Sequence, residues 1–256
     1  MSNNIIELRG ITKRFSGTVA LNNVSFGVKE GETHCLCGEN GAGKSTLINL
    51  IGGVLKEDEG TILIEGKEEN ISTISESERL GIGIVHQEVP LCLNMTIAQN
   101  IFLGHVPMKA GIFIDEKEMN NKTAELLSFF RLDKSPDTIL ANLSIAEQSI
   151  VQIAKVVHKK PRILILDEPT AALTNDQRDT LFEVLSDLKR ENNTTIIYVS
   201  HRLEEIKMIG DSITVLKDGE FVKTVSVNDV TIDELIALVV MSIEVGNILL
   251  TPKMKL

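Results

Sequence analysis

The sequence contains few cysteines and no long apolar run, and these scarcities exclude several classes of protein. The cysteines are Cys35, Cys37 and Cys92, an odd number without metal-ligand pairing, which favours a reducing compartment over a disulfide framework. Cys35 and Cys37 stand two apart in a strand-like run, and we expect them to be small buried apolar residues rather than metal or redox groups. No segment is apolar over the roughly 18 residues of a membrane-spanning helix, so any role at a membrane is predicted to be peripheral.

Basic charge is scarce as well. The formal net charge is −10, and a wide surface for a phosphate backbone usually needs a basic face, so we do not expect nucleic acid as a partner. Residues 1–7 lack a basic region followed by an apolar run and a cleavage site, and export is therefore not predicted. The 256 residues are 43% hydrophobic, which is enough for a substantial core.

The order of strand and helix patterns predicts an α/β protein in three parts. Residues 5–11 and 22–28 read as short strands on either side of a turn, which indicates an N-terminal antiparallel β layer. Between about residues 91 and 160 the pattern becomes helical, with apolar faces over 116–130 and 147–157, and we interpret this part as an insertion. Elsewhere short branched apolar runs alternate with helical stretches, as in βαβ units with buried parallel strands. The strands are predicted at 33–37, 61–65, 82–85, 163–166 and 195–199, the helices at 45–51, 177–191 and 231–240, and a hairpin at 213–225.

A glycine-rich loop follows the strand at 33–37 and opens the helix at 45–51. It matches G-x-x-x-x-G-K-[ST] in the strand, loop and helix context that a phosphate-binding loop requires. The predicted nucleotide-binding residues here are Gly38, Glu39, Asn40, Gly41, Ala42, Gly43, Lys44, Ser45 and Thr46. Glycines let successive N–H groups point at phosphate oxygens, Lys44 adds a full positive charge, and Ser45 is expected to bind Mg²⁺. The structural alternative is a flexible turn before a helix.

An acidic pair, Asp167 and Glu168, ends the apolar run at 163–166. A buried strand delivers a carboxylate rigidly at its C-terminal end, so Asp167 is expected to hold Mg²⁺ through water. Glu168 points elsewhere and is expected to orient and deprotonate the attacking water as general base. Alone, such a pair is usually the solvated start of a loop. Together with the phosphate loop it is the second half of a Mg-nucleotide site.

From about residue 5 to residue 240 the chain resembles the ATP-binding cassette family. The resemblance implies an ATPase that uses ATP and Mg²⁺, with a P-loop NTPase core around a parallel sheet, an N-terminal antiparallel β subdomain and an inserted α-helical subdomain. Phe15 matches the aromatic residue that stacks on adenine, where the alternative is an ordinary packing residue. Gln87 matches the glutamine that touches Mg²⁺ and water beside the membrane-subunit surface. His201 matches the histidine that contacts the γ-phosphate, where the alternative is a satisfied loop or core histidine.

The segment 143–147 departs from the signature of that family. In place of L-S-G-G-Q it keeps Ser144 but has Ala146 and Glu147 where the family has a glycine and the glutamine. Ser144 and Glu147 alone fit a capping box for the helix at 147–157. In the family, Ser144 and this helix N-terminus would face the γ-phosphate of another cassette. A Cβ at Ala146 and a negative charge at Glu147 predict poor completion of a partner's site.

Three further segments, 100–104, 168–174 and 200–206, resemble the bacterial sugar-importer ATPases of the ribose, galactose and xylose type. The resemblance implies a peripheral position on the cytoplasmic face of the membrane. The implied partners are integral-membrane permease subunits, a second cassette and, indirectly, an extracytoplasmic sugar-binding protein. Such ATPases typically carry two cassettes in one polypeptide, so we expect residues 1–240 to form the first nucleotide-binding domain. Residues 241–256 would be a tail or the start of a linker to a second cassette, and a half-length relative is the alternative.

Three other classes of function compete with ATP-driven sugar import. A soluble cassette acting on ribosomes or DNA needs a basic partner surface, which the acidic balance disfavours. A guanine-nucleotide switch needs an N-K-x-D string, which the sequence lacks. A non-catalytic nucleotide-binding module is compatible with the altered signature.

Overall fold

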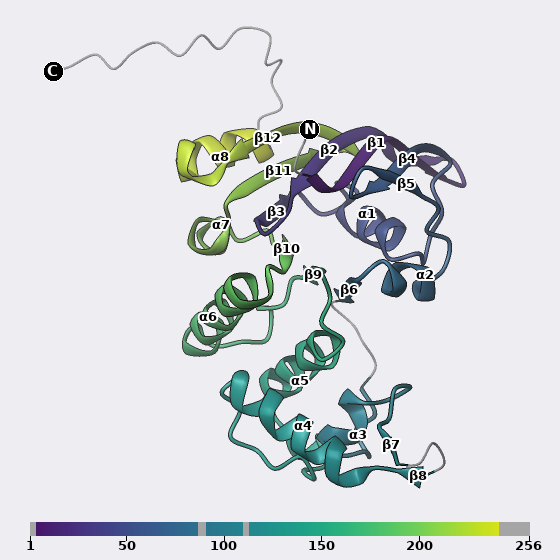
Figure 1. Ribbon diagram of the computed structural model, residues 1–256. Helices are drawn as coiled ribbons and strands as arrows, with labels where there is room; N and C mark the ends of the chain where they lie inside the picture. The colour runs from purple at the N-terminus through teal and green to yellow at the C-terminus, as the bar shows by residue number, and fades with distance from the viewer. Residues whose placement is uncertain (1–3, 87–90, 110–112, 241–256) are drawn as a thin grey trace, which may run out of the picture.

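The computed structural model describes residues 4–86, 91–109 and 113–240, and it places two large sheets at one end and a group of helices at the other (Figure 1). The first sheet has four strands in the order β2-β1-β4-β5. Its strands are β1 (Asn4–Phe15), β2 (Thr18–Lys29), β4 (Glu59–Ile64) and β5 (Lys67–Glu69), and each neighbouring pair is antiparallel. The expected N-terminal antiparallel layer is confirmed.

The second sheet has six strands in the order β12-β11-β3-β10-β9-β6. Its strands are β3 (Thr33–Cys37), β6 (Ile82–Val85), β9 (Ile163–Asp167), β10 (Thr195–Val199), β11 (Ser212–Lys217) and β12 (Glu220–Ser226). All neighbouring pairs are parallel except β11 and β12, which form the expected hairpin. Every residue of β3 and β10 is buried, which explains why these strands are continuous apolar runs rather than alternating ones.

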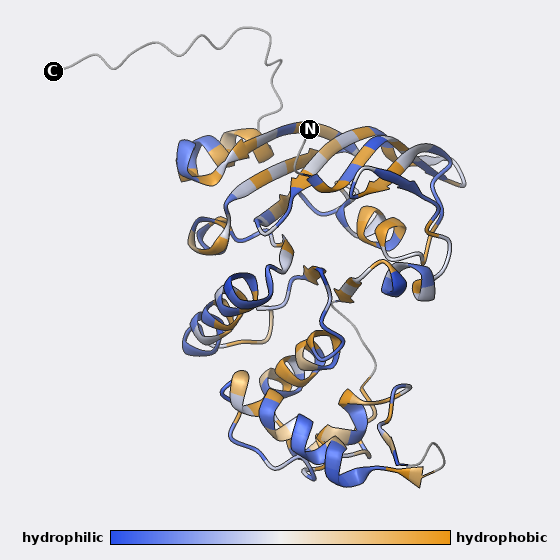
Figure 2. Ribbon diagram, in the orientation of Figure 1, coloured by the Kyte–Doolittle hydropathy of each residue, from blue (hydrophilic) through white to orange (hydrophobic). Residues whose placement is uncertain are grey.

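Five of the described helices pack beside the two sheets. These are α1 (Lys44–Ile51), α2 (Ile74–Arg79), α6 (Asn175–Asn192), α7 (Leu203–Ile209) and α8 (Ile232–Val240), with a short 3-10 turn at Val227–Asp229. The apolar stripe of α6 is buried against the core that contains Tyr198 of β10, whereas its other residues are charged or polar (Figure 2). Cys35 and Cys37 lie in the same core as small buried residues, as expected.

The helical group lies between β6 and β9 in the sequence and far from the four-stranded sheet in space (Figure 1). It consists of α3 (Ile97–Ile101), α4 (Glu116–Phe129), α5 (Ile145–Val157), a 3-10 turn at Leu140–Asn142 and a small hairpin of β7 (Met108–Lys109) and β8 (Phe113–Ile114). The buried face of α5 packs with α3 and α4 into the larger core. An inserted helical subdomain is therefore confirmed. No helix within the described residues is long and apolar enough to cross a membrane.

Candidate functional site

The loop 38–43 joins β3 to α1 and has a backbone that only glycine adopts easily. Gly43 has φ of 96° at the N-terminal end of α1, and a Cβ there would lie 2.6 Å from Leu21 Cδ2 and 2.7 Å from the Ala20 carbonyl oxygen. No side chain caps α1 at this end, in contrast to α5, whose first turn is closed by a capping box. The first N–H groups of α1 are thus left for an anion such as phosphate.

Lys44 is buried, and its ammonium group folds back over the loop. Its Nζ donates to the carbonyl oxygen of Gly38 at 2.8 Å and to that of Glu39 at 3.0 Å. The positive charge is therefore held beside the loop by two neutral acceptors rather than by a carboxylate. A phosphate oxygen carries the negative charge that these carbonyl oxygens lack, so a phosphate group would compete well for the ammonium group.

A cavity of about 350 Å³ brings the predicted motifs together. It is lined by Ala20, Asn40, Gly41, Gly43, Lys44, Ser45, Thr46, Asp167, Glu168 and His201. Residues more than 120 positions apart in the sequence share this cavity because β3, β10 and β9 are adjacent and parallel, so that the loops after them meet at one edge of the sheet.

Asp167 ends β9, and its carboxyl group is destabilised as an anion. Burial raises its pKa above the ordinary value, the adjacent Glu168 raises it further, and His86 and Lys44 oppose the change. A cation beside Asp167 would relieve this penalty. The hydroxyl of Ser45 lines the same cavity, and together they offer the oxygen ligands that Mg²⁺ prefers. The donor set therefore fits Mg²⁺, with Ser45 and Asp167 as the residues that would hold it.

Glu168 and His201 both line the cavity and form a pair. Glu168 Oε1 lies 2.8 Å from His201 Nδ1, and the Glu168 N–H donates to the Val199 carbonyl oxygen at 3.0 Å. Glu168 has φ of 49°, a conformation that costs a non-glycine residue free energy. A carboxylate held in this way can accept a proton from a water molecule in the cavity.

Other predicted site residues lie outside the cavity lining. Phe15 is at the exposed end of β1, with the Lys13 Nζ 5.8 Å from its ring centroid. Ala42 is buried, while Gly38 and Glu39 contribute the carbonyl groups that hold Lys44. Gln87 lies outside the described residues, so its predicted contacts with Mg²⁺ and water stay predictions.

Ser144 caps α5 in the predicted capping box and does not line the cavity. Its hydroxyl accepts from the Glu147 N–H, and Glu147 Oε2 accepts from the Ser144 N–H at 2.8 Å and from the Ser144 hydroxyl at 2.9 Å. The Ser144 N–H lowers the pKa of Glu147 below its ordinary value, and Lys134, 3.1 Å from Glu147 Oε1, adds to this. The helix begins at Ile145, two residues before the predicted start, because this cap precedes it.

Two residues near the site carried no sequence signal. Ala20 lines the cavity through a strand of the other sheet, and an alanine in a strand has no chemistry to single it out. His86, which acts on Asp167, precedes the predicted Gln87 but has no motif of its own. Both belong to the site only because of the tertiary arrangement.

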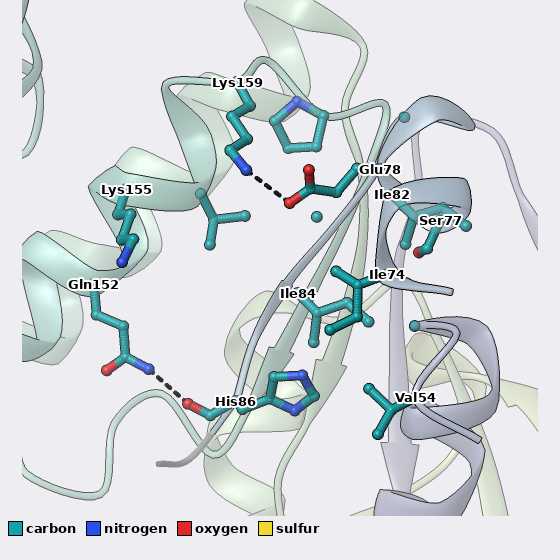
Figure 3. Close-up of a pocket in the computed structure, with 15 residues that line it drawn as sticks. Val54, Ile74, Ser77, Glu78, Ile82, Ile84, His86, Gln152, Lys155 and Lys159 are labelled. Atoms are coloured by element: carbon teal, nitrogen blue, oxygen red, sulfur yellow. Dashed lines mark hydrogen bonds and ion pairs between the residues drawn. The ribbon is translucent and has the colours of Figure 1, made fainter. Parts of the chain in front are cut away.

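A second cavity, of about 250 Å³, lies between α2, β6 and α5 (Figure 3). Its apolar side contains Val54 and Ile74, which are 50% and 59% exposed. Lys155 lines it from α5 and Lys159 from the turn that follows this helix, and Lys159 Nζ pairs with Glu78 at 2.7 Å. His86 also lines it, and its carbonyl oxygen accepts from Gln152 Nε2 at 2.7 Å, so this cavity reaches the residue that precedes Gln87 in the sequence.

Comparison with known proteins finds relatives that are named as ATP-binding proteins of sugar transport. A xylose import ATP-binding protein of Thermoanaerobacter pseudethanolicus is 47% identical over 242 residues, which cover 94% of this chain and 48% of the relative. An L-arabinose transport ATP-binding protein of Geobacillus stearothermophilus is 45% identical and covers 92% of this chain and 46% of its own length. The chain thus spans about half the length of the curated relatives it matches.

Solved structures agree with the fold. An ATP-binding cassette of an ABC transporter superposes with a TM-score of 0.81 at 27% identity, covering 92% of this chain and 98% of that one. A dimeric bacterial ABC transporter cassette gives a TM-score of 0.76 at 28% identity, with 87% and 98% covered. The profile described as ABC transporter matches residues 21–171, a span that contains the phosphate loop, Ser144, Asp167 and Glu168. On these matches and on the geometry of the cavity, the chain belongs to the ABC transporter family.

Proposed function

We propose that this chain binds MgATP and hydrolyses it, and that the hydrolysis drives import of a sugar through a membrane transporter. The observation that supports hydrolysis is the single cavity shared by the loop at Lys44, the carboxylate of Asp167 and the Glu168–His201 pair. The relatives named for xylose and arabinose import support a sugar as the cargo. Because substrate selection would belong to a permease and a binding protein, this chain does not identify the sugar.

Each predicted site residue would have a separate role in binding or hydrolysing ATP. The N–H groups of the loop and Lys44 would bind the β- and γ-phosphates, with Lys44 exchanging the carbonyl oxygens of Gly38 and Glu39 for phosphate. Bound Mg²⁺ would neutralise developing charge on the phosphates. Glu168 would take the proton of the attacking water, and His201 would orient Glu168 and contact the γ-phosphate. Phe15 would stack on adenine, and Gln87 would reach Mg²⁺ and water.

Two variants test this site. Glu168→Gln keeps the shape of the side chain but cannot accept the proton, so ATP binding by titration calorimetry should persist while phosphate release falls by about 10²- to 10⁴-fold. Lys44→Ala should instead weaken MgATP binding, because it removes the only lysine that lines the cavity within the described residues. Lys207→Ala is the matched control, since Lys207 also donates to two carbonyl oxygens but in α7. Unchanged turnover in Glu168→Gln would remove Glu168 from the base role, whereas no turnover in the wild-type chain would leave a non-catalytic nucleotide-binding module.

The second cavity is the proposed contact with the permease. This hollow has exposed apolar side chains and includes His86, the residue before Gln87 in the sequence, and a partner bound there would be linked through Gln87 to the nucleotide (Figure 3). The cell location that follows is peripheral, on the cytoplasmic face of the membrane. Ile74→Glu should leave ATP hydrolysis by the chain alone intact but abolish its stimulation by the permease. Met208→Glu, at an exposed apolar residue of α7, should keep that stimulation.

The half-length match also supports a second cassette as partner. We propose that residues 1–240 form one nucleotide-binding domain, with the helical subdomain at about 91–160, and that the site is completed by Ser144 of another cassette. Residues 241–256, predicted as a tail or a linker, lie outside the described part of the chain.

A further inference from the structure

Glu205, in α7, is a buried carboxylate that the proposed chemistry does not use. Its side chain is 2% exposed. It is surrounded by donors: Thr170 Oγ1 lies 2.9 Å from both carboxylate oxygens, the Tyr198 hydroxyl 2.8 Å from Oε2, the Ser200 hydroxyl 3.1 Å from Oε2 and an Arg202 guanidinium nitrogen 3.2 Å from Oε1. A buried charge is tolerated only with such compensation.

The donors around Glu205 belong to the two loops that carry the Glu168–His201 pair. Thr170 is two residues after Glu168, on the loop that leaves β9. Ser200 and Arg202 stand immediately before and after His201, on the loop that leaves β10, and the Arg202 N–H also donates to the Ser200 hydroxyl at 3.0 Å. The carboxylate of Glu205 therefore binds both loops. The same two loops carry Glu168 and His201, whose Oε1 and Nδ1 atoms lie 2.8 Å apart.

The hydroxyl groups in this cluster have no alternative in water. Thr170, Tyr198 and Ser200 are each buried to 3% exposure or less, and burial raises the pKa of the Tyr198 hydroxyl so that it stays a donor. Removing the acceptor would leave these donors unpaired, and the loops would have to shift to find others. A displacement of about 1 Å in a catalytic group is enough to lower a rate by about 10²-fold.

We propose that Glu205 is a positioning residue for ATP hydrolysis, which holds Glu168 and His201 together by anchoring the loop of each. The proposal rests on the proposed function of Glu168 and His201. If it is correct, the loss of Glu205 affects kcat and the dissociation constant of ATP differently. The hydrogen bonds of Glu205 described above go to Thr170, Tyr198, Ser200 and Arg202 rather than to the loop 38–43, so the loss of Glu205 should lower kcat and leave the dissociation constant of ATP nearly unchanged.

The sharpest test is a pair of variants at Thr170. Thr170→Val keeps the shape and removes only the hydroxyl that links the Glu168 loop to Glu205, whereas Thr170→Ser keeps that hydroxyl. We expect kcat to fall by about 10- to 100-fold in Thr170→Val and by less than about 3-fold in Thr170→Ser, with ATP affinity by calorimetry unchanged in both. Equal kcat in the two variants would overturn the proposal.

Glu205→Gln tests the carboxylate itself. Its matched control is Glu32→Gln, which removes a carboxylate hydrogen-bonded to His34, with Glu32 Oε1 2.9 Å from His34 Nδ1. Glu32 precedes β3, at the end of this strand that is remote from the loop 38–43. We expect both changes to lower the melting temperature but only Glu205→Gln to lower kcat. If Glu205→Gln fails to fold, the Thr170 pair still decides. An equal loss of kcat in Glu32→Gln would show that general destabilisation is responsible.

A readout without turnover separates this proposal from the proposed function. In nucleotide-free protein, the imidazole resonances of His201 should change on Glu168→Gln, because the pair is formed. In the Thr170→Val background that response should be much smaller, and in Thr170→Ser it should be retained. If the wild-type chain hydrolyses no ATP but these responses hold, the proposed function is wrong and the anchoring is right. A full response in Thr170→Val would refute the anchoring whatever the activity.

Discussion

At the scale of a single residue, the negative charge of Asp167 would be stabilised by a bound cation and destabilises the folded protein when no cation is bound. Replacing it with asparagine removes a charge that burial and Glu168 destabilise. We therefore expect Asp167→Asn to raise the melting temperature of the nucleotide-free chain at neutral pH, by about 2 to 4 °C for each 1 kcal/mol gained. The same change should remove the effect of Mg²⁺ on nucleotide binding, because a carboxylate ligand is lost.

The pH dependence of this gain follows from the direction of the pKa change. A carboxyl group whose pKa is raised in the folded state destabilises the protein above that pKa and has no such effect below the pKa of the unfolded chain. The difference between Asp167→Asn and the wild type should therefore be largest at neutral pH, should shrink as the pH falls through the raised pKa of Asp167, and should vanish below the pKa that this carboxyl group has in the unfolded chain. Melting curves recorded over a pH series measure it, and a lower melting temperature for the variant at pH 7 would contradict this account.

At the scale of an element, the N-terminal end of α5 has a structural role as a capped helix start and a proposed role in completing the nucleotide site of another cassette. Ser144 closes its capping box, and a lost serine cap costs about 1 kcal/mol of unfolding free energy, so Ser144→Ala should lower the midpoint of a urea titration. The control is Thr96→Ala, which opens the capping box of α3 in the same helical group. Both variants should lose comparable stability, but only Ser144→Ala should slow ATP hydrolysis at high protein concentration. Equal loss of hydrolysis in both would reduce Ser144 to a structural cap.

The best predicted elements are those in which an apolar run or a helical period is long enough to be recognised in the sequence. The fully buried strands β3, β9 and β10 and the helices α4, α5 and α6 were found because apolar runs or a helical period extend over most of their length. No pattern in the sequence predicted α2, α3, α7 or the strands β5, β7 and β8. These elements have two to seven residues, too few for a period to show, and tertiary pairing decides their conformation.

At the scale of the whole molecule, the sequence predicted which residues share the nucleotide cavity better than how they are held. Lys44, Ser45, Asp167, Glu168 and His201 were assigned from motifs, and the parallel sheet brings them to one cavity. Glu205 lay within a segment used only for the family resemblance. Its role as acceptor depends on donors from β10 and from the loop after β9, and contacts between such distant segments leave no mark in the local sequence.

Ser144 does not line the cavity of its own chain, so we expect the nucleotide site to be complete only when two cassettes pair. The isolated chain should hydrolyse ATP slowly, and the rate per chain should rise with protein concentration. One missing donor at the γ-phosphate costs about 10²- to 10³-fold in rate. Mixing gives a direct test. Chains with Lys44→Ala and chains with Ser144→Ala should each be inactive, but a mixed dimer has one site with Lys44 from one chain and Ser144 from the other. An equimolar mixture should therefore recover up to about a quarter of the wild-type phosphate release if chains pair at random. No recovery in the mixture, together with rapid hydrolysis by dilute wild-type chain, would show that each cassette works alone.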